Sequence, residues 1–231
     1  MAMNDWPSLW LTAKLAALTT VLLLFMATPI AWWLATTRSR WATALDALVA
    51  MPLVLPPTVM GFYLLLFLSP QGALGQWWLE LTGEQLTFSF MGLVVASIFY
   101  SLPFAVQPLQ ASFRGVDNQL LEAGATLGAS PMDRFIHLVL PLSRRGYLTA
   151  GILTFAHTVG EFGVVLMIGG NIPGETRVVS IAIYEAVETL NYGAAHRLSL
   201  VLIGFSFLVL ALTYGVNRYF SLLSRDPVSH D

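Results

Sequence analysis

Charged residues are scarce in this 231-residue chain, where Asp, Glu, Lys and Arg together make up only 10% of the sequence. A typical soluble domain is about 25% charged, because a surface that faces water needs ionised side chains. Hydrophobic residues make up 56% of the chain, and its mean hydropathy is +0.71. This composition argues against a soluble enzyme and indicates an integral membrane protein.

Lysine and cysteine are nearly or wholly absent, since Lys14 is the single lysine and the chain has no cysteine. A Walker A loop needs a lysine directly after its glycines, and Lys14 follows Thr12 and Ala13. Without cysteine, the chain forms no disulfide, thiolate nucleophile or Cys-ligated metal site. The net charge of −2 offers no basic surface for nucleic acid. We therefore expect no ATP site of the Walker type, no cofactor and no nucleic-acid partner.

Five apolar runs are long enough to cross a bilayer, whose hydrocarbon core of about 30 Å requires about 20 helical residues. The first run exceeds the roughly 7 to 15 residues of a signal-peptide core, and no basic residue precedes Lys14, so we interpret it as a retained helix. The sequence predicts a single all-α transmembrane domain over residues 1–231, with spans at about 15–37, 47–68, 88–110, 146–170 and 198–218.

The distribution of basic residues predicts the orientation of these spans, because Arg and Lys accumulate in cytoplasmic loops. Eight basic residues follow the first, third and fifth spans: Arg38, Arg40, Arg114, Arg134, Arg144, Arg145, Arg218 and Arg225. Three lie on the other side: Lys14, Arg177 and Arg197. We expect a periplasmic N-terminus, a cytoplasmic C-terminus and a cytoplasmic loop over about residues 111–145.

Prolines interrupt the second span, where Pro52, Pro56 and Pro57 lie at hydrocarbon depth. Each proline removes a backbone donor and clashes with the preceding turn. A broken helix survives at that depth where protein or a water-filled cavity satisfies the freed carbonyls. The segment is therefore either a packed kink or a wall of a translocation path, to which Pro56, Pro57 and Thr58 would contribute.

The fourth span carries His157 and Glu161, which are four residues apart and would share one face of a continuous helix. Ionisable residues within spans usually face the interior of the bundle or an aqueous cavity. A metal site needs a third or fourth ligand, and no other His or carboxylate lies nearby, so we expect no metal. Glu161, between Gly160 and Gly163, either packs and hydrogen-bonds or lines a path. For an anionic cargo we expect it to orient a helix or gate rather than hold the anion.

The cytoplasmic segment 118–145 predicts two short helices. Ser130 before Pro131, with Asp133 in the first turn, is typical of a helix N-terminus. In the preceding helix, Gly124 and Gly128 would leave a groove for a partner, beside an apolar stripe of Leu120, Leu121, Ala125 and Leu127. Alternatively, Gly128 ends that helix in a left-handed conformation.

This segment resembles the cytoplasmic signature of importer permeases of the ATP-binding cassette class. The signature reads Glu-Ala-Ala, three residues, Gly, nine residues, Ile, one residue, Leu-Pro. Its positions fall here on Glu122, Ala123, Gly124, Gly128, Leu138, Leu140 and Pro141. Two positions differ, because Gly124 replaces the third residue of the triplet and Leu138 replaces Ile. The resemblance implies a type I importer permease fold whose cytoplasmic coupling helices contact an ATPase.

The rest of the chain resembles the molybdate branch of these permeases. Three segments show this resemblance: Met51 to Gly61, Gly160 to Gly163, and Asn171 to Arg177. The first two are also similar to sulfate and thiosulfate permeases. The resemblance implies an inner-membrane homodimer with two cytoplasmic ATPase subunits and a periplasmic oxyanion-binding protein. Molybdate, or the similar tungstate, would be the cargo, and the chain itself would hydrolyse no ATP.

Three alternatives remain at this point. A sulfate or thiosulfate permease is the nearest, because sulfate and molybdate share charge and shape. A secondary transporter would show internal repeats and coupling carboxylates at mid-membrane, whereas only Glu161 lies at depth. An intramembrane enzyme would carry motifs such as Gly-x-Ser-x-Gly or His-Glu-x-x-His, which are absent.

Overall fold

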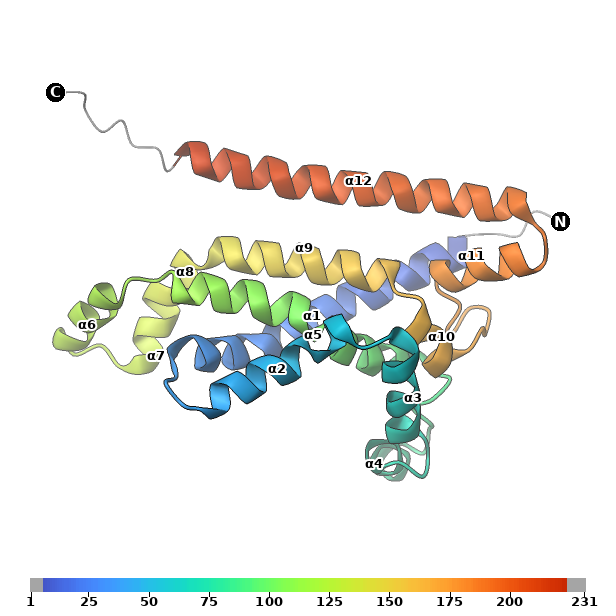
Figure 1. The fold of residues 1–231 in the computed structure, drawn as a ribbon, viewed down its shortest axis with the longest axis horizontal. Coiled ribbons are helices and arrows are strands. Elements are labelled where there is room, and N and C mark those ends of the chain that lie inside the picture. Colours follow the sequence, from blue (N-terminus) through green and yellow to red (C-terminus); the bar gives the residue numbers. More distant parts are fainter. Residues whose placement is uncertain (1–5, 224–231) are drawn as a thin grey trace.

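The computed structural model describes residues 6–223, which fold into an elongated set of helices with no strand among them (Figure 1). Three helices are each long and apolar enough to cross a membrane: α1 (Trp6–Thr36), α5 (Phe90–Arg114) and α12 (Tyr192–Leu223), the last counted over Tyr192–Ala211. Two bent helix pairs raise the number of candidate spans to as many as five. The predicted all-α membrane fold is thus confirmed, with three to five candidate spans.

The remaining elements are shorter. They are α2 (Trp41–Val54), α3 (Pro57–Leu68), α4 (Ala73–Thr82), α6 (Asn118–Thr126), α7 (Pro131–Arg134), the π-helix η1 (Phe135–Val139), α8 (Leu140–Leu142), α9 (Arg144–Gly160), α10 (Gly163–Gly169) and α11 (Val179–Glu188). The pair α2 and α3 is bent by 112°, and the pair α9 and α10 by 63°. The predicted second and fourth spans are therefore not continuous helices.

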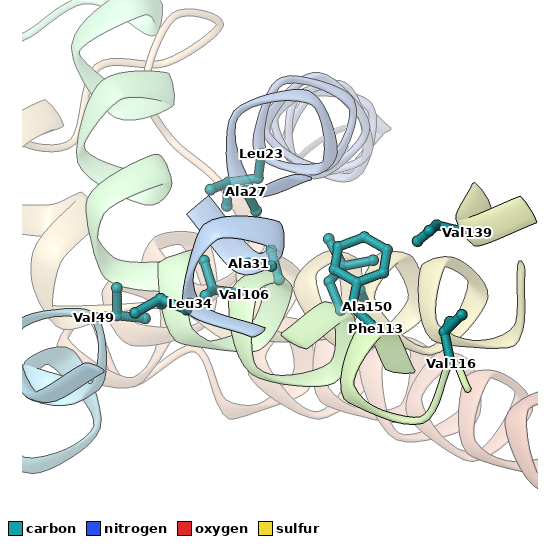
Figure 2. Packing of buried hydrophobic residues seen from close by; sticks show 12 residues of the cluster. Leu23, Ala27, Ala31, Leu34, Val49, Val106, Phe113, Val116, Val139 and Ala150 are labelled. Atoms are coloured by element: carbon teal, nitrogen blue, oxygen red, sulfur yellow. The ribbon is translucent and has the colours of Figure 1, made fainter. Parts of the chain in front are cut away.

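The largest hydrophobic cluster joins α1, α5 and α9, with Phe113 and Val139 at one end (Figure 2). Small residues line the contact, including Ala27 and Ala31 of α1 and Ala150 of α9. Lipid tails are as apolar as leucine side chains, so helices in a bilayer associate mainly by close packing, which small residues permit. The helices α2, α3 and α10 pack against α5 of this bundle.

The two ends of the bundle carry different elements (Figure 1). The short helices α6 and α7 lie at the same end as the turn between α1 and α2 and the C-terminal end of α12. The beginning of α1, the segment between α10 and α11, and the turn between α11 and α12 lie at the opposite end. The segment that contains α6 and α7 and the segment 171–177 therefore lie at opposite ends of the bundle.

The break between α2 and α3 follows directly from two consecutive prolines. A residue before proline is disfavoured in the helical region, and Leu55 accordingly has an extended backbone with φ −72° and ψ 136°. Pro56 is also non-helical, whereas Pro57 occupies the first turn of α3, where a missing N–H costs nothing. The predicted interruption of this span is confirmed, and Pro52 lies within α2.

The break between α9 and α10 contains no proline, and the sequence analysis, which treated 146–170 as one span, did not predict it. α9 ends at Gly160, and Glu161 has an extended backbone with φ −70° and ψ 137°. The φ of Glu161 is still close to the helical value, so the chain leaves the helix only at the ψ of Glu161, after His157. Contacts with other helices hold this break: the Ser180 hydroxyl of α11 donates to the Glu161 carbonyl at 2.5 Å.

The two breaks meet in space. A Cβ atom added to Gly163 would lie 2.7 Å from Cβ of Pro57, closer than real Cβ contacts allow. A turn further along, a Cβ on Gly61 would lie 2.8 Å from the sulfur of Met167. The helices α3 and α10 thus pack against each other as one unit, set at an angle to α2 and α9.

At the opposite end, α6 ends at Thr126 and Gly128 follows its C-cap Leu127, so the prediction that Gly124 and Gly128 share a helix face was wrong and the alternative, that Gly128 ends the helix, is confirmed. Gly128 has φ +85° and no neighbour within 4 Å of an added Cβ. The N–H of Ala129 donates to the Gly124 carbonyl, and the N–H of Gly128 to that of Ala125, both at 3.0 Å. This is the Schellman arrangement, in which a left-handed glycine ends a helix.

Gly124 contacts the chain itself rather than leaving a groove open. An added Cβ would lie 3.3 Å from the side chains of both Arg134 and Leu138. Arg134 also donates to the Leu121 carbonyl at 3.2 Å. The signature positions 124 and 138 therefore pack on each other, and α6 is held against α7 and η1 by this contact.

The second loop helix begins as predicted. The Ser130 hydroxyl accepts a hydrogen bond from the Asp133 N–H at 3.1 Å, and Asp133 in turn accepts from the Ser130 N–H at 3.2 Å, with Pro131 in the first turn. The hydroxyl and the N–H of Ser130 hold the pKa of Asp133 below its ordinary value. A lowered carboxyl pKa stabilises the fold at pH values above the ordinary pKa of about 4, so this cap is fully formed at neutral pH.

Gly163→Ala is expected to destabilise the protein, because the added methyl group would meet the rigid Pro57 ring. Overpacking of this kind costs about 1 to 3 kcal/mol. Gly160→Ala is the matched control, since nothing lies within 4 Å of a Cβ there. Thermal unfolding in detergent should show a lower midpoint for Gly163→Ala and a midpoint near wild type for Gly160→Ala. Equal midpoints for the two variants would contradict the contact between the breaks.

Gly128→Ala is expected to fray the end of α6, because a left-handed backbone costs an ordinary residue about 1 to 2 kcal/mol. Gly128→Asn should be close to wild type, since Asn tolerates this conformation. Hydrogen exchange of the last amides of α6 measures the difference directly. If the alanine and asparagine variants exchange at the same rate, Gly128 does not act as the end of the helix.

Candidate functional site

A cavity of about 580 Å³ lies where the two broken helix pairs cross. It is lined by Pro57, Thr58, Tyr100, Ala156, His157, Gly160, Glu161, Phe162 and Gly163. Five of the six residues predicted for a translocation path are among these, and the sixth, Pro56, directly precedes Pro57 in the chain. Segments about 100 residues apart in the sequence, predicted separately, therefore form one site.

Glu161 occupies the break itself and is buried, with 5% of its surface exposed. One carboxylate oxygen, Oε2, accepts a hydrogen bond from the Ser97 hydroxyl of α5 at 3.1 Å. The other, Oε1, has no hydrogen-bond partner in the structure. With its backbone carbonyl bonded to Ser180, Glu161 connects α5, the break and α11. Its geometry is that of a residue that fixes the position of the break.

His157, on the last turn of α9, is held on three sides. Its ring stacks on Phe104 with centroids 4.0 Å apart and lies 5.1 Å from the ring of Tyr100. Its Nδ1 atom is 2.9 Å from the hydroxyl of Ser101. The sequence analysis expected His157 to face the bundle interior or an aqueous cavity, but it weighed only a metal-ligand role for this residue and did not include it among the path residues. The serines at 97 and 101, one turn apart on α5, were the available signal.

The cavity wall carries little charge. None of the described residues that line it is Lys or Arg, and its ionisable side chains are Tyr100, His157 and Glu161. Hydroxyl, imidazole and carboxyl groups can exchange hydrogen bonds with a polar solute, whereas a fixed cation would hold an anion strongly. The described wall of the cavity therefore offers hydrogen bonds and no fixed positive charge.

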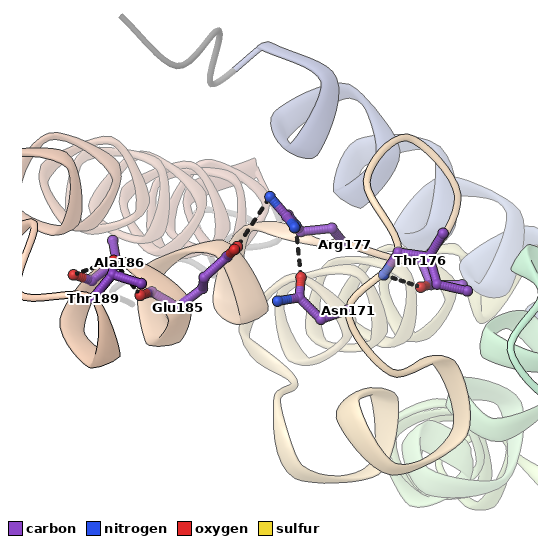
Figure 3. Close-up of polar contacts among 7 residues, drawn as sticks. Asn171, Thr176, Arg177, Glu185, Ala186 and Thr189 are labelled. Carbon is purple, nitrogen blue, oxygen red and sulfur yellow. Dashed lines mark hydrogen bonds and ion pairs between the residues drawn. The ribbon is translucent and has the colours of Figure 1, made fainter. Parts of the chain in front are cut away.

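The segment after α10 is also rigidly built (Figure 3). Arg177 donates to the Asn171 side chain at 2.6 Å and forms an ion pair with Glu185 of α11 at 3.0 Å. The Thr176 hydroxyl donates to the Gly169 carbonyl at 2.7 Å. These contacts fix the segment 171–177, which carried the resemblance to the molybdate branch, directly beyond α10.

The predicted coupling residues lie at the other end of the molecule and do not contact the cavity. Glu122, Ala123, Gly128 and Pro141 are exposed, whereas Gly124, Leu138 and Leu140 are partly buried. Glu122 lines a second cavity, of about 380 Å³, together with Arg38 and Arg114. Arg114 also lies 3.8 Å from Asp46 of α2. Sequence reasoning missed this juxtaposition, because residues of α1, α2 and α5 meet there only through folding.

Comparison with known proteins places the chain among transporter components. Residues 16–223 match the family described as binding-protein-dependent transport system inner membrane component. The molybdenum transport system permease protein ModB of Azotobacter vinelandii is 56% identical over 221 residues, covering 96% of this chain and 98% of that protein. Its namesake in Escherichia coli K12 is 32% identical, covering 93% and 94%.

A sulfate relative is also similar, but over less of its own length. The sulfate transport system permease protein CysT of Escherichia coli K12 is 33% identical over 201 residues, covering 87% of this chain and 71% of that protein.

Solved structures share the fold. A bacterial alginate ABC transporter, in complex with its alginate-bound periplasmic protein, superposes with a TM-score of 0.75 at 15% identity, covering 95% of this chain and 80% of that one. A second structure of an alginate importer gives a TM-score of 0.71. The family match over most of the chain, together with this fold, shows that the chain belongs to the binding-protein-dependent transport system inner membrane components.

Proposed function

We propose that the chain is the membrane-spanning permease subunit of an ATP-driven importer that carries molybdate across the inner membrane. The single observation that carries this proposal is the 56% identity to a molybdenum transport permease over nearly the full length of both proteins. The sulfate permease is less similar and matches less completely, which favours molybdate over sulfate. The chain is a transport subunit, and ATP hydrolysis takes place in a partner.

In this proposal the cavity between the two breaks belongs to the translocation path. Broken helices within a membrane are tolerated where they line a cavity, and both breaks line this one. Pro56, Pro57, Thr58, Gly160 and Gly163 form its wall or gate, and Glu161 holds the second break in place. A cavity without a fixed cation releases a dianion readily, so that selectivity comes mainly from the periplasmic oxyanion-binding protein.

The proposed topology has five spans, with each bent pair counted as one. An odd number of spans puts the two termini on opposite sides, as the arrangement in Figure 1 supports. The arginine-rich segment around α6 and α7 then faces the cytoplasm, because basic residues are retained there. The N-terminus and the segment 171–177 face the periplasm.

The helices α6 and α7 are proposed to couple the permease to a cytoplasmic ATPase. Large apolar side chains are exposed on this segment, including Leu127 at 88% and Met132 at 65%. Exposed apolar residues beside charged ones are typical of a docking surface, and Glu122 supplies an exposed carboxylate there. Gly124 and Leu138 act within the chain, since their contact holds the two loop helices together. Leu140 and Pro141 lead from the loop into α9.

Two copies of the chain and two ATPase subunits are proposed to form the transporter. The helix α3 leaves a row of aromatic side chains exposed: Phe62, Tyr63 and Phe67. Because α3 also borders the cavity, a second copy packed on this face would enclose a path between the two cavities. The periplasmic binding protein would deliver its anion to that interface.

Uptake into proteoliposomes tests this function. The chain, its ATPase and its binding protein are reconstituted, and accumulation of molybdate, tungstate and sulfate is measured with and without ATP. We expect ATP-dependent accumulation of molybdate, with tungstate competing and sulfate at tenfold excess competing weakly. The isolated chain should hydrolyse no ATP. Accumulation of sulfate without molybdate would instead support the sulfate permease.

Single cysteines test the orientation without background, because the chain has none of its own. Glu84→Cys and Glu175→Cys should react with a membrane-impermeant maleimide in spheroplasts, since both positions are exposed on the proposed periplasmic side. Gln119→Cys, exposed on α6, should react only after the membrane is permeabilised. The reverse labelling pattern would contradict the proposed topology.

A further inference from the structure

A chain of polar contacts beside the cavity connects the imidazole of His157 to two hydroxyl groups and a backbone carbonyl. The Thr158 hydroxyl donates to the Thr154 carbonyl at 2.9 Å, as is common for threonine within a helix. The Ser101 hydroxyl lies 3.2 Å from the Thr158 oxygen and 2.9 Å from Nδ1 of His157. Each hydroxyl has one proton to donate, so the direction of the chain follows from its first bond.

Because Thr158 donates to the carbonyl, its oxygen can only accept from Ser101. Ser101 has then used its single proton, so the contact with His157 is a hydrogen bond only if Nδ1 donates to Ser101. When all three contacts are hydrogen bonds at once, the single proton of a neutral imidazole lies on Nδ1, and the other nitrogen, Nε2, bears a lone pair.

This arrangement conflicts with the proposed cargo unless a proton is added. A fully ionised oxyanion has only acceptor oxygens, and a bare Nε2 is also an acceptor. The lining of the cavity offers no Lys or Arg among the described residues to offset the repulsion. A proton between Nε2 and an anion oxygen removes the conflict and supplies a charge-assisted hydrogen bond.

We propose that His157 takes up one proton at Nε2, from the water on the side to which the cavity is open, when the oxyanion occupies the cavity. An N–H bond forms at Nε2, the imidazole becomes an imidazolium, and the proton returns to water when the anion leaves. This inference rests on the proposed function and adds to it one residue of anion recognition and a dependence on pH.

The ionisable surroundings of His157 are few. Tyr100 of α5 and Glu161 of the break line the cavity with it. The helices α3 and α10 contribute Pro57, Thr58 and Gly163, which do not titrate. The described parts of α1, α11 and α12 place no side chain on the cavity wall, and Lys14 of α1 lies over the ring of Phe90 instead. His157 is thus the one basic side chain on the described wall.

The test measures ATP-driven molybdate uptake by the reconstituted transporter between pH 6 and pH 8.5, relative to variants assayed with the same ATPase and binding protein. Binding linked to one proton strengthens by up to about tenfold for each unit by which the pH falls. We therefore expect the uptake of wild type, divided by that of His157→Gln at the same pH, to rise as the pH falls. Glutamine cannot take up a proton, so the ratio cancels the pH dependence of the partners.

Ser101→Ala distinguishes protonation from a merely structural role. Without the hydroxyl, the neutral ring can place its proton on Nε2 and donate without taking up another, so transport should continue with a flatter pH profile. Ser89→Ala is the matched control, since it removes a hydroxyl at the start of the same helix, α5, that bonds only backbone groups there. Its pH slope should equal that of wild type.

The tautomer can be observed directly by ¹⁵N NMR of the imidazole nitrogens, with His157→Gln used to assign the signal. The proposal predicts a protonated Nδ1 and a bare Nε2 without cargo, and two protonated nitrogens when molybdate is trapped. A proton on Nε2 without cargo overturns it. So do identical pH profiles for wild type, His157→Gln and Ser101→Ala in transporters that still import molybdate. Absence of oxyanion uptake by wild type at every pH would instead overturn the proposed function, and this inference with it.

Discussion

The contact between Pro57 and Gly163 is the constraint on which the rest of the site depends. Two helices that would otherwise cross the membrane are each interrupted, and their interruptions can lie together only because position 163 has no side chain. That contact brings α3 against α10 and places Glu161 between α5 and α11, where Ser97 and Ser180 bond it. The cavity is the space left over when two bent helices cross at their bends.

A site built in this way suits a subunit that neither binds its cargo tightly nor supplies energy. The described cavity wall has no fixed cation, and the chain has no loop for ATP. In the proposed function, energy enters from a partner ATPase at α6 and α7 and must reach a cavity toward the other end of the bundle. The helices α5 and α9 connect the two regions; they are packed on α1 by small residues and carry Ser97, Ser101 and His157. Rigid helices joined at two bends can convert a push on the loop into a change of the angle between the bends.

Local chemistry decided which features the sequence could predict. The break after α2 was predictable, because proline acts on its own neighbours, and so was the helix start at Ser130. The break after Gly160 was not, because bonds from Ser97 and Ser180, far away in the chain, hold it open. Gly124 and Gly128 have the spacing of a helix face, yet one packs against Leu138 and the other ends the helix with a positive φ. His157 was weighed as a ligand for metal, whereas the role proposed for it depends on a hydroxyl of α5 that only the fold brings near.

Reaction of Thr58→Cys with a charged, water-soluble thiol reagent tests most directly whether the crossing of the two bends is the path. Thr58 lines the cavity at the start of α3, and the chain has no other cysteine. In the assembled transporter, labelling should be fast while ATP is turned over in the absence of cargo and slow when loaded binding protein and molybdate are supplied. Labelling that is the same with and without molybdate, or that occurs only with a membrane-soluble reagent, would contradict a path between the two broken spans.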